Sequence, residues 1–274
     1  MKYAYKNGKI LNGTKDMQVQ TGLTILTEGE KIAAIVPEEM RISGYTKVDL
    51  QGKYIMPGLI NMHVHLAGNG KPQKKQRDNA KLVKTLMSNR ISRAIAYRMV
   101  AGFAKDELLS GVTTIRTVGG LGTFDTRLRD EIKAGKKTGP RILAANEGII
   151  DCAKKAIAND IPVVLGNDVG CPWITQYDFW RELVYFHKYV GVSNAFALYT
   201  ATARAAEMAG IGAETGTIEP GKCADFIVTA KNPLEDLRAL RQIEMVVAKG
   251  RKIDHPQVKR NPVVTAELDK FLVD

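Results

Sequence analysis

The stretch Met56–Leu66 is an apolar run that begins at Pro57-Gly58 and ends in two histidines, His63 and His65. In a β-strand, residues two positions apart point to the same face of the sheet. The pattern therefore predicts a buried strand that presents two imidazole groups on one face at its end. A lone histidine would be an ordinary polar strand-end residue, but paired imidazoles are typical metal ligands. We favour the metal-ligand interpretation over two structural strand-end residues.

The composition indicates the broad class of protein to which the chain belongs. The 274 residues are 45% hydrophobic and 25% charged, which is typical of a globular protein with one large and one small domain. The three cysteines, Cys152, Cys171 and Cys223, form no Cys-x-x-Cys pair. They indicate neither a disulfide framework nor a structural zinc knuckle, so we expect a cytoplasmic location. No apolar run approaches the length of a membrane span, and we expect no membrane partner.

The net charge of +11 raises the question of an acidic partner. Much of the excess lies between residues 71 and 98, where basic and apolar residues alternate. This alternation is typical of the solvated face of helices. Because aromatic residues do not interleave with the basic ones and no nucleic-acid module is recognisable, we expect no nucleic-acid partner.

Both ends of the chain have β character. Within residues 3–55, Tyr3–Tyr5 and Lys9–Leu11 flank Asn7-Gly8, which predicts a hairpin in a small antiparallel region. Strand patterns return after Gly216. We therefore expect residues 1–54 and 213–274 to build one small β-sandwich domain around an inserted core of residues 55–212. Further strands are expected at 23–26, 32–36, 48–50, 54–56, 216–222, 224–228 and 245–250.

The middle of the chain alternates strand and helix patterns, which predicts a parallel α/β core. The four core strands are expected at 55–65, 112–118, 141–145 and 161–167. Helices are expected at 77–110, 128–134, 147–159, 177–189 and 193–209, with Ser193 as the N-cap of the last. In the first helix, the apolar spacing predicts core positions at Leu82, Leu86, Ile91, Ile95 and Met99.

Several segments together resemble the amidohydrolase superfamily of metal-dependent hydrolases. The resemblance covers nearly the whole chain and is greatest for the imidazolonepropionase-like and prolidase-like members, which cleave C–N bonds of cyclic amides or dipeptides. The matching segments are 52–65, Gly111-Val112-Thr113-Thr114, Gly166-Asn167-Asp168, 216–226 and Asn232-Pro233-Leu234-Glu235-Asp236.

This resemblance implies a (β/α)8, or TIM, barrel with its metal site at the carboxyl ends of the strands. It implies that His63 and His65 are zinc ligands on the first strand. Asp168, on the last strand, would bind the metal and take the proton from its water. A bound zinc ion lowers the pKa of its water to about 7, and a nearby carboxylate is a natural base for that water.

The sequence also departs from the family pattern. We find neither the metal-bridging lysine nor the two further histidines that the family has on later strands. His187 and His255 do not end a core strand, and Cys171 has no histidine partner that would make it a nucleophile. The core from residue 54 to residue 212 is well short of the roughly 250 residues typical of a whole barrel. We expect a shortened barrel of about four β/α units, in which the first three strands and the last remain.

Two topologies stay open. In the parent barrel the last strand pairs with the first, which gives the spatial order 3-2-1-8. Reaching that position directly from the third strand with the helix outside needs a left-handed crossover, which is strongly disfavoured. A helix on the former interior would instead give a doubly wound sheet of order 3-2-1-4. An open half-barrel would keep an exposed inner face that favours self-association.

Three functional hypotheses follow. The first is a hydrolase of cyclic amides or dipeptides with one zinc ion on His63, His65 and Asp168. The second is a catalytically inactive remnant with an assembly or structural role, and the third is a shortened version of an intact hydrolase. We adopt the hydrolase, and we expect at most one metal per chain, low activity and a homo-oligomer.

Overall fold

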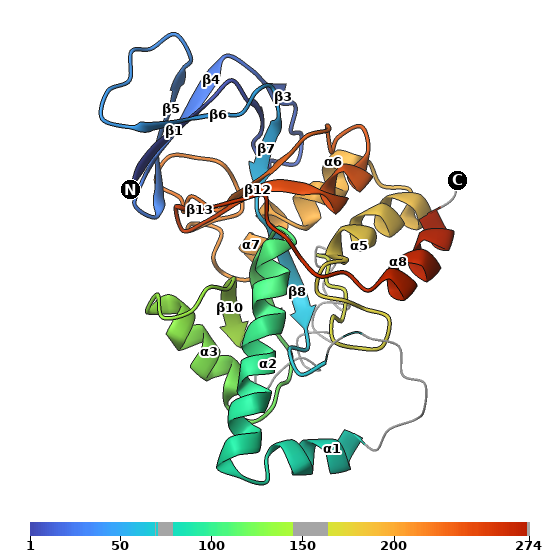
Figure 1. Ribbon diagram of the computed structural model, residues 1–274. Coiled ribbons are helices and arrows are strands. Elements are labelled where there is room, and N and C mark those ends of the chain that lie inside the picture. Colours follow the sequence, from blue (N-terminus) through green and yellow to red (C-terminus); the bar gives the residue numbers. More distant parts are fainter. Residues whose placement is uncertain (69, 71–78, 145–163, 273–274) are drawn as a thin grey trace.

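Strands from both ends of the chain pair in one mixed sheet, in the upper part of Figure 1. The computed structural model describes residues 1–68, 70, 79–144 and 164–272. The six-stranded sheet has the order β13-β12-β11-β7-β2-β3, with β11 antiparallel to β7. Its strands are β2 (Lys9–Leu11), β3 (Val19–Gln20), β7 (Tyr54–Pro57), β11 (Phe226–Thr229), β12 (Ile243–Ala248) and β13 (Arg251–Asp254). A second sheet, of order β5-β4-β1-β6, contains β1 (Lys2–Lys6), β4 (Leu23–Glu28), β5 (Lys31–Pro37) and β6 (Thr46–Asp49).

Apolar side chains of the two sheets form one cluster. Tyr5 and Ile25 from the four-stranded sheet join Ile55, Phe226 and Val247 from the six-stranded sheet. The rings of Tyr5 and Phe226 meet edge to face, 4.9 Å between centroids, a favoured aromatic geometry. This burial stabilises the contact between the sheets. The boundaries of the predicted β-domain, at residues 54 and 213, stay a prediction.

The hairpin predicted at Asn7-Gly8 is wrong. β1 and β2 lie in different sheets, and each pairs in parallel with a strand from residues 46–57. Asn7 has a left-handed φ of 56°, and its carbonyl oxygen accepts the Gly52 N–H at 2.7 Å, where the chain turns from β6 into β7. The turn is present, but it carries the chain from one sheet to the other, so the region is mixed rather than antiparallel.

The core sheet is parallel, with the order β10-β9-β8. Its strands are β8 (Leu59–Val64), β9 (Val112–Thr117) and β10 (Arg141–Ala144), which agrees with the expected order 3-2-1. The predicted fourth strand, 161–167, is irregular over its described part, 164–167. This segment still follows β8, because Leu165 and Val169 accept hydrogen bonds from the N–H groups of Met62 and His65. The described ranges contain no closed barrel.

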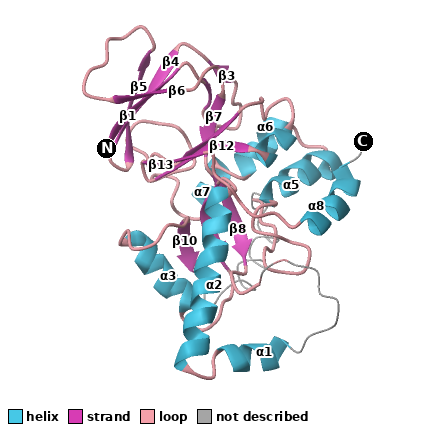
Figure 2. Cartoon of the chain, viewed as in Figure 1, coloured by secondary structure: helices cyan, strands magenta, loops and turns pink. Residues whose placement is uncertain are grey.

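Helices surround this sheet (Figure 2). The predicted helix 77–110 is interrupted, because the side chain of Asn89 accepts the Ser92 N–H at 2.9 Å and begins a new helix. Ser193 is an N-cap as predicted, whereas the predicted helix 147–159 lies outside the described residues. The α-helices are α1 (Asn79–Leu86), α2 (Arg90–Leu109), α3 (Phe124–Lys133), α5 (Phe179–Tyr185), α6 (Asn194–Thr200), α7 (Ala203–Met208) and α8 (Pro262–Asp269). A π-helical turn at Phe186–Val190 and 3-10 turns at Leu237–Arg241 and Lys270–Leu272 complete the set.

The predicted core face of α2 is also wrong. Ile91, Ile95 and Met99 are 75%, 56% and 44% exposed, whereas Val100 and Ala104 on another face are buried. Both faces are apolar, and small residues such as Ala104 permit close packing of the helix on the core. None of the helices in the described ranges is long and apolar enough to cross a membrane.

Near the C-terminus the chain leaves the β region. The buried Arg181 of α5 forms an ion pair with Asp269 of α8, 2.7 Å between Nη2 and Oδ1, and a second with Asp178. Pro262 at the start of α8 suits a first helical turn, where its missing N–H leaves no bond unmade. Within the segment 213–274, for which strands were expected, residues Pro262–Asp269 therefore form a helix that contacts α5.

Candidate metal centre

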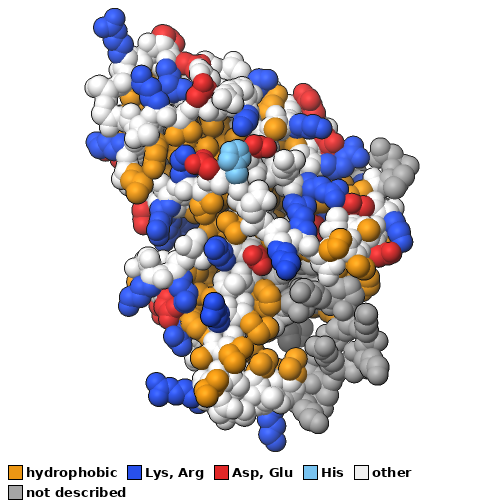
Figure 3. Space-filling view, in the orientation of Figure 1, with side chains coloured by type: hydrophobic (Ala, Val, Ile, Leu, Met, Phe, Trp, Pro, Cys, Tyr) orange, Lys and Arg blue, Asp and Glu red, His pale blue; other side chains and the backbone are white. Residues whose placement is uncertain are grey.

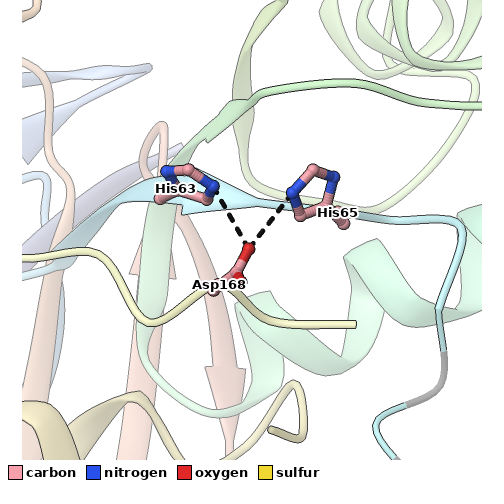
Figure 4. Close-up of side chains that lie close together, drawn as sticks. All are labelled: His63, His65 and Asp168. Atoms are coloured by element: carbon pink, nitrogen blue, oxygen red, sulfur yellow. Dashed lines mark ion pairs between the residues drawn. The ribbon is translucent and has the colours of Figure 1, made fainter. Parts of the chain in front are cut away.

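The three predicted ligands, His63, His65 and Asp168, come together at the carboxyl end of β8 (Figure 4). Each histidine places its Nε2 atom 3.1 Å from the same oxygen, Asp168 Oδ1. One ligand atom from each of the three residues lies within 4.8 Å of the other two. Within the described ranges, no other group of histidine, cysteine and carboxylate side chains has this geometry.

A backbone carbonyl orients His65. Its Nδ1 atom faces the carbonyl oxygen of Gly119 at 3.3 Å. Because that oxygen can only accept a hydrogen bond, Nδ1 carries the hydrogen, and in the neutral ring Nε2 presents its lone pair to Asp168. Such a carbonyl behind the second ring nitrogen is the usual support of a metal-binding histidine.

The facing atoms require a positive charge between them. Asp168 Oδ1 is buried, and no described group donates a hydrogen bond to it. The Nε2 lone pair of neutral His65 and this oxygen are both acceptors, so at 3.1 Å they repel unless a proton or a metal ion lies between them. Two ligands of a tetrahedral zinc ion lie roughly 3.3 Å apart, close to the observed spacing. The residues present therefore fit a divalent metal ion.

The site is open to solvent on one side. The side chains of His63, His65 and Asp168 are 42%, 36% and 49% exposed. Structural zinc sites are closed by four protein ligands, whereas catalytic sites keep one position free for water or substrate. The three predicted ligands, with one side open to solvent, would suit a catalytic site rather than a structural one.

Two glycines allow the Asp168 segment to approach β8. A Cβ atom on Gly166 would lie 2.7 Å from the Cβ of His63, and one on Gly170 would lie 2.1 Å from the carbonyl oxygen of His65. Gly170 also has a φ of +107°, which side-chain-bearing residues rarely adopt. Asp168 itself has a φ of 54°, uncommon for a residue with a side chain. A larger residue at either glycine would displace the carboxylate.

A buried polar pair joins the two ligand-bearing segments. Asn61 Nδ2 donates to Asn167 Oδ1 at 2.7 Å, and Asn61 Oδ1 accepts the N–H of His63 at 3.3 Å. The fully buried Glu107 of α2 lies against Asn61. Burial raises the pKa of the Glu107 carboxyl well above its usual value, and the neighbouring Asn61 side chain offsets only part of this effect. The carboxyl group of Glu107, next to Asn61, is therefore neutral.

A second buried acid stands behind His65. Asp125, in the first turn of α3, is 4% exposed, and its carboxylate lies so close to Gly120 that a Cβ there would be 2.5 Å from Oδ2. Burial raises the pKa of the Asp125 carboxyl, whereas the neighbouring Thr117 and His65 side chains lower it. Asp125 thus packs under the loop whose Gly119 carbonyl holds His65. It is not among the residues predicted from the sequence, although an acid just after a glycine-rich strand exit is a recognisable signal.

Cys171 contacts the third predicted ligand, Asp168. Its thiol donates to Asp168 Oδ2 at 3.3 Å. Burial, followed by the hydrogen bond to Asp168, raises the pKa of the thiol, so it stays a neutral donor. The spacing of three residues from Asp168 could have indicated this contact. His187 and His255 are not in the group: His187 Nδ1 lies 2.6 Å from the carbonyl oxygen of Val192, and His255 lies near Glu244.

The chain is similar to curated proteins over part of its length. The chain is 41% identical over 75 residues to a dihydroorotase from Bacillus pumilus (strain SAFR-032) and 35% identical over 81 residues to one from Syntrophus aciditrophicus (strain SB). Each match covers 27% of this chain and 17% of the relative, so the chain matches about a sixth of the length of these curated relatives.

Solved structures share the fold. A candidate prolidase from Bifidobacterium longum has a TM-score of 0.79 at 23% identity over 99% of both chains. A molinate hydrolase has a TM-score of 0.78 at 16% identity, over 96% of this chain and 97% of that chain. A Xaa-Pro dipeptidase has a TM-score of 0.76 at 18% identity, over 93% of this chain and 100% of that chain.

The sequence profile described as "Amidohydrolase family" matches this chain in two parts, residues 54–152 and 146–253. Together these parts span more than half of the chain and contain His63, His65 and Asp168. The chain belongs to the amidohydrolase family.

Proposed function

We propose that the chain hydrolyses C–N bonds of small amides, either cyclic amides or dipeptides, with the help of one divalent metal ion. The observation that carries this proposal is the convergence of two histidine Nε2 atoms on Asp168 Oδ1 in a solvent-open position. Similarity to proteins named as dihydroorotase and Xaa-Pro dipeptidase supports this substrate class.

His63, His65 and Asp168 would hold the metal ion, for which we propose zinc. A bound zinc ion lowers the pKa of its water to about 7 and polarises a carbonyl group. Asp168 would accept the proton of the attacking water and pass it to the leaving nitrogen as the C–N bond breaks. Cys171 and Asn167 hold this carboxylate in place, and the Gly119 carbonyl keeps the His65 lone pair directed at the site.

We expect weak activity. Three ligands supply one metal position, and no second position can be built from the residues that match the family resemblance. Hydrolysis also needs a pocket that orients the scissile amide, and correct orientation supplies a large part of the rate. The exposed fractions of the three ligand side chains indicate an incomplete pocket wall.

A second candidate function is assembly without catalysis. The exposed apolar residues Ile91, Ile95 and Met99 of α2 favour it, and hydrophobic side chains gather over the lower part of α2 in Figure 3. Self-association through such a face would make the homo-oligomer that we propose. A third candidate is a function that belongs to a longer form, since the chain matches only 17% of the curated relatives' length.

The test combines metal analysis with a hydrolysis screen. Purified protein would be analysed for bound metal and assayed on Xaa-Pro dipeptides and cyclic amides, beside His63→Ala, Asp168→Ala and the remote control His187→Ala. We expect at most one metal per chain and weak turnover, both lost in the first two variants and kept in the control. Wild-type protein without metal or turnover, but with concentration-dependent self-association, would favour assembly.

A further inference from the structure

A cavity of about 210 Å³ lies at the opposite end of the parallel sheet from the candidate metal centre. It is bordered by Thr113 and Arg141, at the beginnings of β9 and β10, and by Lys249 and Arg251 of the β12–β13 hairpin. In a parallel sheet the strand beginnings lie at the edge away from the carboxyl ends. The cavity is therefore separate from His63, His65 and Asp168.

The rim of this cavity is cationic. Asp225 is already occupied, because its Oδ2 pairs with Arg141 at 3.0 Å and its Oδ1 accepts the Lys249 N–H at 2.7 Å. Lys and Arg side chains gather over α3 and the β12–β13 hairpin in Figure 3. The basic lining residues are Lys133, Lys137, Arg141, Lys249, Arg251 and Lys252, and the acidic ones are Glu30 and Asp225.

Three of these cations are available to a ligand. Lys137 and Lys252 pair with Glu131 and Asp254. For the side chains of Lys133, Lys249 and Arg251, no carboxylate within the described part of the chain lies at ion-pair distance. Like charges held around one cavity produce a positive potential that attracts anions.

The floor of the cavity is apolar. Leu108 of α2, Ile132 of α3 and Ile253 of β13 line it together with Ala248. Leu108 is 2% exposed, so this surface is continuous with the core. Small-molecule sites typically combine an apolar lining with a few charged groups that fix orientation.

We propose that this cavity binds a small organic anion, with an apolar body on the floor and a phosphate or another doubly charged group at the basic rim. Lys133 approaches from α3, and Lys249 and Arg251 approach from the β12–β13 hairpin, so the anion would join the core to the β-rich region. Charge-assisted hydrogen bonds from Lys and Arg to phosphate are stronger than neutral ones. The bound anion would therefore stabilise this junction.

The test is calorimetric titration of the whole chain with phenyl phosphate, compared with inorganic phosphate and with phenol. Phenyl phosphate carries both the charge and the apolar body, so it should bind at least tenfold more tightly than either control compound. Lys133→Ala combined with Arg251→Ala should weaken binding roughly tenfold, or about 1.4 kcal/mol. Lys105→Ala combined with Lys259→Ala removes the same charge elsewhere and should have little effect. Lys249→Ala, a second variant of the basic rim, should also weaken the binding of phenyl phosphate.

Three outcomes would overturn the proposal. Equal affinities for phenyl phosphate and inorganic phosphate would show that the floor is not used. Equal weakening by the rim pair and the control pair would indicate a general charge effect. Loss of binding in His63→Ala, with the rim variants unaffected, would place the ligand at the metal centre. Melting temperatures of all variants check that each one is folded.

Discussion

Asn61 and Asn167 are hydrogen-bonded in the interior, with Asn61 Nδ2 donating to Asn167 Oδ1 at 2.7 Å. Asn61 lies two residues before His63 on β8, and Asn167 directly precedes Asp168. Both side chains are almost fully buried, so water cannot replace the bond. This contact is one of those that hold Asp168 near the two histidines, together with the backbone bonds from Met62 to Leu165 and from His65 to Val169.

We predict that Asn61→Ala weakens metal binding roughly 10- to 100-fold, the usual effect of losing a residue that supports a ligand. The variant should also lose about 1–3 kcal/mol of unfolding free energy, because Asn167 keeps a buried, unsatisfied oxygen. Calorimetric zinc titration and urea unfolding measure the two effects. Asn232→Ala removes a similar amide far from the site and should leave zinc affinity unchanged. Equal affinity losses in both variants would contradict the prediction.

Gly166→Ala should displace Asp168. The new methyl group would lie 2.7 Å from the Cβ of His63 and 2.8 Å from its backbone nitrogen, so the segment must move away from β8. We expect a loss of about 1–3 kcal/mol of stability and loss of metal binding.

Gly102→Ala is the matched control for this substitution. Gly102 lies in α2, and a methyl group added there would have open space within 4 Å, so alanine should stabilise the helix by roughly 0.5–1 kcal/mol. Thermal unfolding of both variants checks the opposite signs. A Gly166→Ala protein that keeps full stability and metal content would show that the contact is not needed.

The buried Glu107 predicts a specific pH dependence. Burial raises the pKa of its carboxyl well above 4.5, so the folded state holds a proton that the unfolded chain releases once the pH exceeds 4.5. Stability from this group is therefore complete below pH 4.5 and falls, by up to about 1.4 kcal/mol per pH unit, until the pH passes the folded-state pKa.

Glu107→Gln removes this titration. The unfolding free energy of the wild type relative to Glu107→Gln should fall as the pH rises from 4.5 to 8, as measured by urea unfolding. Glu39→Gln, on the exposed surface, should run parallel to the wild type. Parallel curves for Glu107→Gln and the wild type would mean that Glu107 is ionised in the folded state.

Removing one partner of the Arg141–Asp225 pair should be costly. Both side chains are nearly buried, at 12% and 2% exposed, and the pair joins β10 to the start of β11. Arg141→Met leaves the carboxylate of Asp225 without its cation, and we expect a loss of about 3–5 kcal/mol. Arg129→Met breaks an exposed pair with Asp130 and should change stability by less than about 1 kcal/mol. Thermal unfolding distinguishes the two.

The convergence of His63, His65 and Asp168 could be predicted because the types of these residues and their positions in the sequence coincide. His63 and His65 end an apolar strand, and the family resemblance points to Asp168 after a second apolar segment. That segment follows β8 through the bonds from Met62 to Leu165 and from His65 to Val169, although it is not a regular strand. The supporting residues could not be predicted in the same way. Glu107 is 46 residues from Asn61 in the sequence, and nothing in its helix distinguishes it from a surface acid.

The errors in the fold have a common cause, which is competition between equivalent local patterns. Asn7-Gly8 favours a tight turn, but such a turn is compatible both with a hairpin and with a passage from one sheet to another. Here β1 pairs with β6, about 40 residues away, instead of with β2. In α2, two apolar faces compete, and the burial of Val100 and Ala104 depends on packing against the core. The segment 164–168 has apolar strand character, but Gly166 and the left-handed Asp168 prevent a regular ladder.

The place of β11 in the six-stranded sheet has a consequence for synthesis of the chain. β11 lies between β7 and β12, so the edge of β7 stays unpaired until residues 226–229 have left the ribosome. About 170 residues separate the two partners, and contacts so distant in sequence form slowly. During that interval the exposed edge of β7 is open to pairing with other chains. Chaperone demand in the cell should therefore track the time needed to translate the core between the two strands.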